Sequence, residues 1–203
     1  MAFAGTHSRS AKSGKLMEAM MEIGDILREQ DVVIRMPAKG KRSALTRIAA
    51  QLGNNVGKGV GEVLTALQRR ERLGSTGIGH GVAVPHARIE GIAGPVAMMA
   101  TLQEPVWFGS PDNDPVDLLL AFLWPSSDMA GFLPTLASFC RLLRQPELRA
   151  RLRGSDSPAE ARAWLAFFDE KGTRGPSQLG GEARQGALKP VMGIARQTVP
   201  CSV

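Results

Sequence analysis

Residues 116–124 read Val-Asp-Leu-Leu-Leu-Ala-Phe-Leu-Trp, and only Asp117 interrupts the apolar run. A short run of this kind is typical of a central strand that is buried on both faces. Further strand signals lie at residues 32–36, 82–84 and 96–102, and helical patterns occur between and after them. Strands that alternate with helices pack in layers. The sequence therefore predicts an α/β fold in which helices flank both faces of a mixed sheet.

The helical segments are marked by apolar residues at helical spacing and by signals at their ends. We expect helices within residues 16–27, over residues 41–52, 61–73, 129–144 and 146–152, and from residue 157 onward. The last helix begins with Ser157 as N-cap, Pro158 at its first position and Glu160 in its first turn. The glycine-rich residues 57–61 lack the Lys-Ser/Thr ending of a P-loop. They therefore predict a connection between helices and not a nucleotide site.

The length and the distribution of charge indicate one domain with two polar ends. The chain has 203 residues and a net charge of +6. We expect a disordered lead at residues 1–15, a single domain at residues 16–170 and a basic, disordered tail at residues 171–203. The lead carries +3 and the tail +4, which leaves −1 for the domain. The domain itself is therefore not expected to bind nucleic acid.

The cysteines and the hydropathy pattern indicate the cytoplasm. Cys140 lies in an apolar helical pattern, where a small buried thiol is expected, and Cys201 lies near the end of the tail. Two such cysteines do not form a disulfide framework, which fits a reducing compartment. No run of 18 apolar residues occurs, and the lead lacks the apolar core of a signal peptide. We therefore expect a cytoplasmic protein without a membrane span.

Residues 73–86 read Leu-Gly-Ser-Thr-Gly-Ile-Gly-His-Gly-Val-Ala-Val-Pro-His. Pro85, directly before His86, has its φ angle fixed by its ring. Arg70 and Arg88 lie on either side of the segment. Guanidinium groups bind phosphate oxygens, and a neutral imidazole can accept a phosphoryl group. The alternative is a structural histidine that bonds a backbone group in a glycine-rich loop. These residues are equipped to carry a phosphoryl group on His86, but the spacing by itself leaves the structural alternative open.

Residues 74–86 resemble the active-site signature of the enzyme IIA domains of the bacterial phosphotransferase system. The likeness is to the fructose/mannitol class, and within it to the nitrogen-regulatory IIA type, and it extends more weakly over about residues 20–170. The resemblance implies a mixed sheet of about five strands with the histidine at a strand end. It also implies that His86 accepts phosphate from an HPr-like phosphocarrier, which is charged from phosphoenolpyruvate through an enzyme I. Arg70 is at the position of the family's active-site arginine, and no cofactor is implied.

The groups expected to bind the phosphate surround the histidine in the sequence. The backbone amides of the turn at residues 77–81 form a nest-like seat for an anion, with Gly77, Gly79 and Gly81 giving the backbone its freedom. The hydroxyl of Thr76 is a further donor, with a turn-stabilising role as the alternative. Arg88 is a second cation, with a solvated surface charge as the alternative. His80 is expected at the rim of the pocket, and a metal site is not expected because the nearby residues lack ligand spacing.

Two residues depart from the family pattern. Many members carry a second histidine early in the helix after the central strand, and Phe132 occupies the matching position here. A phenyl ring cannot donate a hydrogen bond to a phosphoryl oxygen, so we expect weaker or slower transfer, or a carrier adapted to different partners. The residue after the active histidine, commonly glycine, is Ala87 here.

Three functions remain open from the sequence. The first is a phosphohistidine carrier of a nitrogen-regulatory phosphotransferase system, which regulates target proteins through its phosphorylation state. The second is a binding module of the same fold that cannot be phosphorylated, with Phe132 as the trace of that loss. The third is a sugar-specific IIA component of the fructose/mannitol type.

Overall fold

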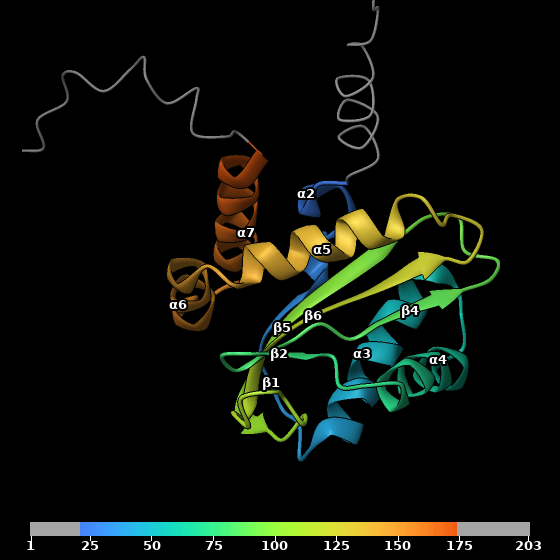
Figure 1. The fold of residues 1–203 in the computed structure, drawn as a ribbon, viewed down its shortest axis with the longest axis horizontal. Helices are drawn as coiled ribbons and strands as arrows, with labels where there is room; N and C mark the ends of the chain where they lie inside the picture. Colours follow the sequence, from blue (N-terminus) through green and yellow to red (C-terminus); the bar gives the residue numbers. More distant parts are fainter. Residues whose placement is uncertain (1–20, 174–203) are drawn as a thin grey trace, which may run out of the picture. The chain divides into compact units, whose positions relative to one another are not determined.

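The computed structural model describes residues 21–173 of the chain. The expected lead at residues 1–15 and all but the first three residues of the expected tail lie outside the described residues. The described part forms one six-stranded mixed sheet, one strand more than expected (Figure 1). Its strands are β1 (Val32–Met36), β2 (Gly77–Gly79), β3 (Val82–Ala83), β4 (His86–Ile89), β5 (Val96–Val106) and β6 (Val116–Pro125).

Helices cover both faces of the sheet, as the alternation of strands and helices predicted (Figure 1). One face packs against the two consecutive helices α3 (Lys41–Val56) and α4 (Val60–Arg72). The other face packs against α2 (Ile23–Ile26), α5 (Phe132–Leu143), α6 (Pro146–Gly154) and α7 (Pro158–Thr173). Each face has its own cluster of buried apolar side chains, and the sheet separates the two clusters.

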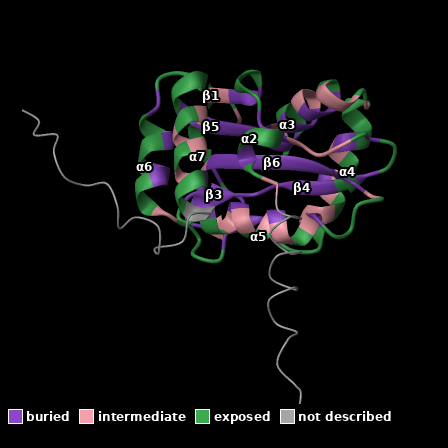
Figure 2. Cartoon of the chain, turned by 90° about the horizontal axis from the view of Figure 1, so that it is seen from above, coloured by how far each residue is buried: buried purple, intermediate pink, exposed green. Residues whose placement is uncertain are grey.

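Strand β6 is the centre of this arrangement. All its residues are buried except the half-buried Asp117 (Figure 2). It pairs antiparallel with β5 along one edge and parallel with both β3 and β4 along the other, so the sheet order is β1-β5-β6-β3-β2 with β4 continuing beside β6. The prediction of a central strand buried on both faces is confirmed, and this strand sets the register of the segment that carries His86.

The segment around Pro85 differs from its prediction. One strand was expected at residues 82–84, but the chain forms β3 and β4 on either side of Val84 and Pro85. Proline has no amide hydrogen for the ladder. Its carbonyl instead accepts a hydrogen bond from the amide of Phe122, and pairing with β6 resumes with His86 opposite Phe122. His86 is thus the first residue of a strand, as the resemblance implied.

The helix ends follow local signals. Gly57 ends α3 with a left-handed φ of 67°, and Gly59 precedes α4, which confirms the predicted inter-helix connection. The Ser157 hydroxyl accepts a hydrogen bond from the Glu160 amide at the start of α7. Helix α5 begins at residue 132, not 129, and in the turn before it the Asp128 carboxylate accepts hydrogen bonds from the amides of residues 130 and 131. Helix α7 extends to residue 173, three residues beyond the expected end of the domain.

Two further expectations concern the helix before β1 and the cysteine on α5. Of the helix expected within residues 16–27, the structure describes only α2, since residues 16–20 lie outside the described range. Cys140 is a free, half-buried thiol on α5 rather than a buried one.

Within residues 21–173, no helix combines the length and the apolar character needed to cross a membrane.

Candidate active site

The imidazole of His86 is buried, with 5% of the residue exposed, and both of its nitrogens have a partner. Nδ1 lies 2.8 Å from the carbonyl oxygen of Val84. A carbonyl can only accept, so Nδ1 carries the proton and Nε2 carries the lone pair. Nε2 accepts a hydrogen bond of 2.9 Å from Nε of Arg70. The backbone before Pro85 therefore selects the tautomer whose Nε2 is the nucleophilic nitrogen.

The environment keeps this imidazole neutral. Burial lowers the pKa of His86 below its ordinary value of 6.5, because a buried site disfavours the charged ring. The hydrogen bond to Val84 opposes this effect, and the positive charge of Arg70 lowers the pKa further. A neutral imidazole near pH 7 keeps the Nε2 lone pair available.

Arg70 reaches His86 from the last turn of α4. Its Nε donates to His86, and its Nη1 donates to the carbonyl oxygen of Gly74, 2.9 Å away. The guanidinium therefore links the helix end, the glycine-rich loop and the imidazole. It is held beside the nitrogen at which a phosphoryl group would arrive.

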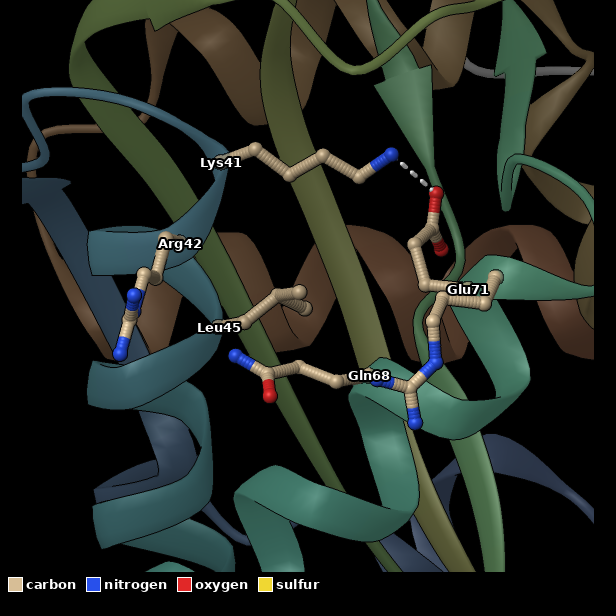
Figure 3. Close-up of a pocket in the computed structure, with 6 residues that line it drawn as sticks. Lys41, Arg42, Leu45, Gln68 and Glu71 are labelled. Atoms are coloured by element: carbon tan, nitrogen blue, oxygen red, sulfur yellow. Dashed lines mark ion pairs between the residues drawn. The ribbon is translucent and has the colours of Figure 1, made fainter.

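The neighbouring residue, Glu71, braces the same loop from the other side of the helix. Its carboxylate accepts hydrogen bonds from the amide of Thr76, at 3.1 Å, and from the hydroxyl of Thr76, at 2.6 Å. It also forms an ion pair of 2.5 Å with Lys41, which reaches across from α3 beside a pocket of about 390 Å³ (Figure 3). The Glu71 side chain is only 7% exposed. Glu71 thus fixes the loop and α3 to the helix turn that carries Arg70.

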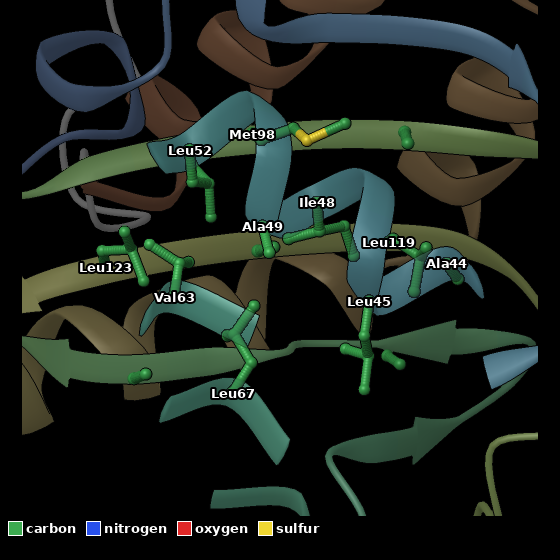
Figure 4. Packing of buried hydrophobic residues seen from close by; sticks show 14 of the residues in the cluster. Ala44, Leu45, Ile48, Ala49, Leu52, Val63, Leu67, Met98, Leu119 and Leu123 are labelled. Atoms are coloured by element: carbon green, nitrogen blue, oxygen red, sulfur yellow. The ribbon is translucent and has the colours of Figure 1, made fainter. Parts of the chain in front are cut away.

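The direction of Arg70 depends on the buried side of α4. Val63 and Leu67 point from α4 into the apolar cluster beneath the sheet (Figure 4). The same cluster contains Leu45 and Ile48 of α3 and Leu123 of β6. Residue 70 follows residue 67 by one helical turn, so the packing of Leu67 places Arg70 over the edge of the sheet where β4 begins.

A pocket of about 570 Å³ opens at this edge. His86, Arg70, Arg88 and Phe132 line it together. The remaining lining residues come from α4, the loop after it, β4 and the loop after β6: Glu62, Thr65, Ala66, Arg69, Leu73, Ala87 and Ser126. Arg88 is exposed, and its guanidinium contacts the sulfur of Met129. The pocket therefore combines one neutral imidazole with several cations and an aromatic wall.

Comparison with known proteins identifies the family. The model of the family described as "Phosphoenolpyruvate-dependent sugar phosphotransferase system, EIIA 2" matches residues 25–167. The chain belongs to this family. It is thereby a component of the phosphotransferase system, whose partners in general are phosphocarrier proteins.

Curated relatives and a solved structure carry nitrogen-regulatory names. A nitrogen regulatory protein of Escherichia coli is 31% identical over 157 residues, which cover 77% of this chain and 95% of the relative. One from Bradyrhizobium diazoefficiens is 33% identical over 135 residues, covering 66% and 88%. The crystal structure of nitrogen regulatory protein IIA-Ntr from Neisseria meningitidis matches with a TM-score of 0.68 and 32% identity, covering 70% of this chain and 98% of that one. The predicted likeness to the nitrogen-regulatory IIA type is confirmed.

The EIIA fold does not bring every predicted phosphate ligand to His86. Gly77 packs against Ser110, and Gly79 lies beside Asp112. Gly81, with a φ of 74°, lies against Arg153, and its carbonyl bonds the amides of residues 117 and 118 of β6. Those positions are four or five residues along β6 from Phe122, the partner of His86, or roughly 13–16 Å at 3.3 Å per residue. These glycines serve the turn and the close packing around it, and none of them lines the pocket.

Thr76 and His80 also lie elsewhere than expected. The Thr76 hydroxyl donates to Glu71 and does not line the pocket. The amide of His80, which belongs to the proposed anion seat, donates to the protein's own Asp112 carboxylate at 2.6 Å. His80 is exposed on the turn between β2 and β3 and does not lie at the pocket rim, as had been expected. One amide of the predicted anion site is therefore already hydrogen-bonded to a carboxylate of this chain.

Three residues at the site were missed by the sequence analysis. Phe122 stacks on the imidazole of His86, Val84 selects its tautomer, and Glu71 braces the loop. The role of Val84 has a local signal, since residue 84 directly precedes the proline that presents the histidine. Phe122 and Glu71 act across the fold, and nothing in their sequence neighbourhood indicates which residues they meet.

Proposed function

We propose that this protein is a cytoplasmic phosphohistidine carrier of a nitrogen-regulatory phosphotransferase system. His86 accepts a phosphoryl group from the phosphohistidine of an HPr-like donor, and the phosphorylation state then decides which target proteins bind. One observation carries the proposal: the Nδ1 proton of His86 is held by Val84, which leaves the Nε2 lone pair beside Arg70 at the pocket.

The transfer follows from this geometry. Nε2 attacks the phosphorus in line as the bond between phosphorus and the donor nitrogen breaks, and the donor nitrogen takes the electron pair. Arg70 leaves the lone pair of Nε2 and donates to the phosphoryl oxygens, where it stabilises their charge. Arg88 is the second cation within reach of the pocket. The proton remains on Nδ1, hydrogen-bonded to the carbonyl oxygen of Val84, throughout.

The surface around the pocket suits a protein donor. Leu73 at the pocket rim is 82% exposed, and Met129 and Leu133, on either side of the start of α5, are 63% and 65% exposed. Exposed apolar side chains gathered near a site are typical of a surface that binds protein. Phosphorylation adds about −1.5 to −2 of charge at the centre of this surface. A target that tolerates neutral His86 is then repelled or attracted by the charged form.

The test is phosphorylation by the complete donor chain. The protein is incubated with phosphoenolpyruvate, enzyme I and the HPr-like carrier, and the product is tested for phosphate that is labile in acid and stable in alkali. We expect one phosphoryl group per chain in the wild type and none in His86→Ala. His80→Asn is the matched control, since asparagine tolerates the left-handed φ of 58° at that exposed turn. Label that survives in His86→Ala would disprove the proposal.

One observation favours a second candidate, a binding module that does not carry phosphate. Phe132 lines the pocket at the position where many family members have a histidine, and its ring donates no hydrogen bond to a phosphoryl oxygen. This candidate predicts an unlabelled wild type under conditions that fully charge the donor, together with target binding that His86→Ala leaves unchanged.

A further inference from the structure

Two phenyl rings enclose the imidazole of His86. Phe122 stacks on it with ring centroids 5.5 Å apart and an angle of 18° between the planes. Phe132 lies 5.8 Å away at 56°, and its side chain lines the pocket. Trp124 supports Phe132 from behind, with their centroids 6.0 Å apart. The imidazole therefore has an aromatic neighbour inside the core and another at the pocket wall.

Phosphorylation changes the charge that these rings face. The proton stays on Nδ1, where it is hydrogen-bonded to the Val84 carbonyl, so a phosphoryl group on Nε2 converts the ring to a substituted imidazolium. A cation over the face of an aromatic ring, within about 6 Å of its centroid, is attracted by the quadrupole of that ring. Both phenyl rings meet this distance. The two phenyl rings therefore stabilise the phosphorylated, positively charged ring more than the neutral one.

The same wall resists hydrolysis. Water attacks the phosphorus, the bond from Nε2 to phosphorus breaks, and the electron pair returns to Nε2, which releases orthophosphate. The imidazole is neutral again at the end of this step, so stabilisation of the imidazolium is lost as the transition state is reached. The phenyl ring of Phe132 also has no donor or acceptor that could orient a water molecule in the pocket.

We propose that Phe132 is a shield that prolongs the lifetime of the phosphohistidine at residue 86, so that this protein stores its phosphoryl group and does not relay it rapidly. The inference rests on the proposed function, since it requires His86 to carry phosphate. A histidine at position 132 would instead donate to the phosphoryl oxygens, which favours rapid transfer in both directions. Phenylalanine at this position therefore slows phosphoryl transfer and lengthens the lifetime of the phosphohistidine.

The experiment loads the protein without any donor protein. Potassium phosphoramidate transfers its phosphoryl group to Nε2 and releases ammonia, so loading does not depend on recognition by an HPr-like carrier. After removal of the reagent, ³¹P NMR at pH 7.5 follows the decay of the phosphohistidine to orthophosphate. The wild type is compared with Phe132→Leu, Phe132→Ala and Phe132→His.

The variants separate the two contributions of the ring. Phe132→Leu keeps an apolar wall and removes the π-face, and we expect its half-life to fall about threefold. Phe132→Ala also opens the wall to water, and we expect a fall of roughly tenfold. In Phe132→His, we expect the phosphohistidine to be hydrolysed faster than in the wild type. We also expect this variant to exchange its phosphoryl group faster with the HPr-like carrier. Phe167→Leu, the same change at an exposed ring on α7 that does not line the pocket, is the matched control and should keep the wild-type half-life.

Two results would overturn the inference. The first is a half-life in folded Phe132→Leu and Phe132→Ala within twofold of the wild type. The second is a wild-type His86 that phosphoramidate cannot label, because the pocket would then hold no phosphoryl group. Labelling by phosphoramidate but not by the HPr-like carrier would refute the proposed donor. The same decay measurement would still test the role of Phe132.

Discussion

At the scale of single residues, the site depends on two hydrogen bonds that treat the two nitrogens of His86 differently. Val84 holds the proton on Nδ1, and Arg70 approaches the lone pair of Nε2. A guanidinium beside a lone pair is a favourable neighbour only for a neutral imidazole. The two bonds therefore define both the charge state and the reactive atom before any donor arrives.

The pKa of His86 provides a direct test of this arrangement. Because burial and Arg70 lower this pKa in the folded protein, we expect the midpoint of the ring's titration to lie below pH 6.5. The depressed value contributes stability that is complete above 6.5 and is lost as the pH falls through the folded pKa. NMR of the ring nitrogens, with His86→Ala for assignment, measures the titration. A midpoint at or above 6.5 would contradict the geometry.

At the scale of secondary-structure elements, the end of α4 and the loop after it act together. Arg70 and Glu71 are adjacent in the sequence, yet one faces His86 and the other faces Thr76 and Lys41. Consecutive residues of a helix point in different directions, so a single turn serves both the reactive site and its support.

Removal of the Glu71 charge should loosen this loop. In Glu71→Gln, the ion pair with Lys41 and the charge-assisted bonds to Thr76 are lost, and we expect a loss of about 1–2 kcal/mol in the free energy of unfolding. We also expect faster hydrogen exchange of the Thr76 amide and slower phosphorylation of His86, because the support of Arg70 weakens.

Glu62→Gln is the control for stability on the same helix. Glu62 forms an i,i+4 pair with Lys58 at 3.2 Å and is 51% exposed, so its loss should cost less than about 0.5 kcal/mol. Equal losses in urea denaturation for the two variants would show that the bonds of Glu71 do not brace the loop.

At the scale of the whole described domain, a buried carboxylate joins the start of the sheet to α3. Asp31 is 1% exposed and accepts hydrogen bonds from Arg28, Gln51 and Asn55. Burial alone would raise its pKa, but these donors outweigh that effect and lower the pKa below the ordinary value of 3.8. A group with a depressed folded pKa contributes stability that is present above the unfolded pKa and is lost as the pH falls through the folded pKa.

Asp31→Asn should therefore destabilise the protein in a pH-dependent way. We expect a loss of about 2 kcal/mol in the free energy of unfolding at pH 7, and a difference from the wild type that shrinks below pH 4. Urea denaturation across this range measures it. Asp156→Asn is the control, since Asp156 is 88% exposed and pairs with Arg35 at 3.8 Å, and no measurable change is expected. A pH-independent loss at residue 31 would mean that packing and not charge is responsible.

The sequence by itself determined the layers of the fold, the central strand and the family, because these depend on local periodicity and on a contiguous motif. It also identified His86 and Arg70, which the structure brings together at 2.9 Å. It did not determine what the glycines do, since the course of a chain after a glycine depends on its neighbours: Gly77, Gly79 and Gly81 meet Ser110, Asp112 and Arg153 and do not meet His86.

Only the tertiary structure decided which side chains surround the imidazole. Phe122 reaches His86 through the pairing of β4 with β6, and Phe132 reaches it through the packing of α5 on the sheet. Glu71 meets Lys41 because α3 and α4 pack side by side on a common apolar cluster. These contacts join residues that are 30 to 46 positions apart in the sequence, and their geometry follows from register and core packing, which no local pattern encodes.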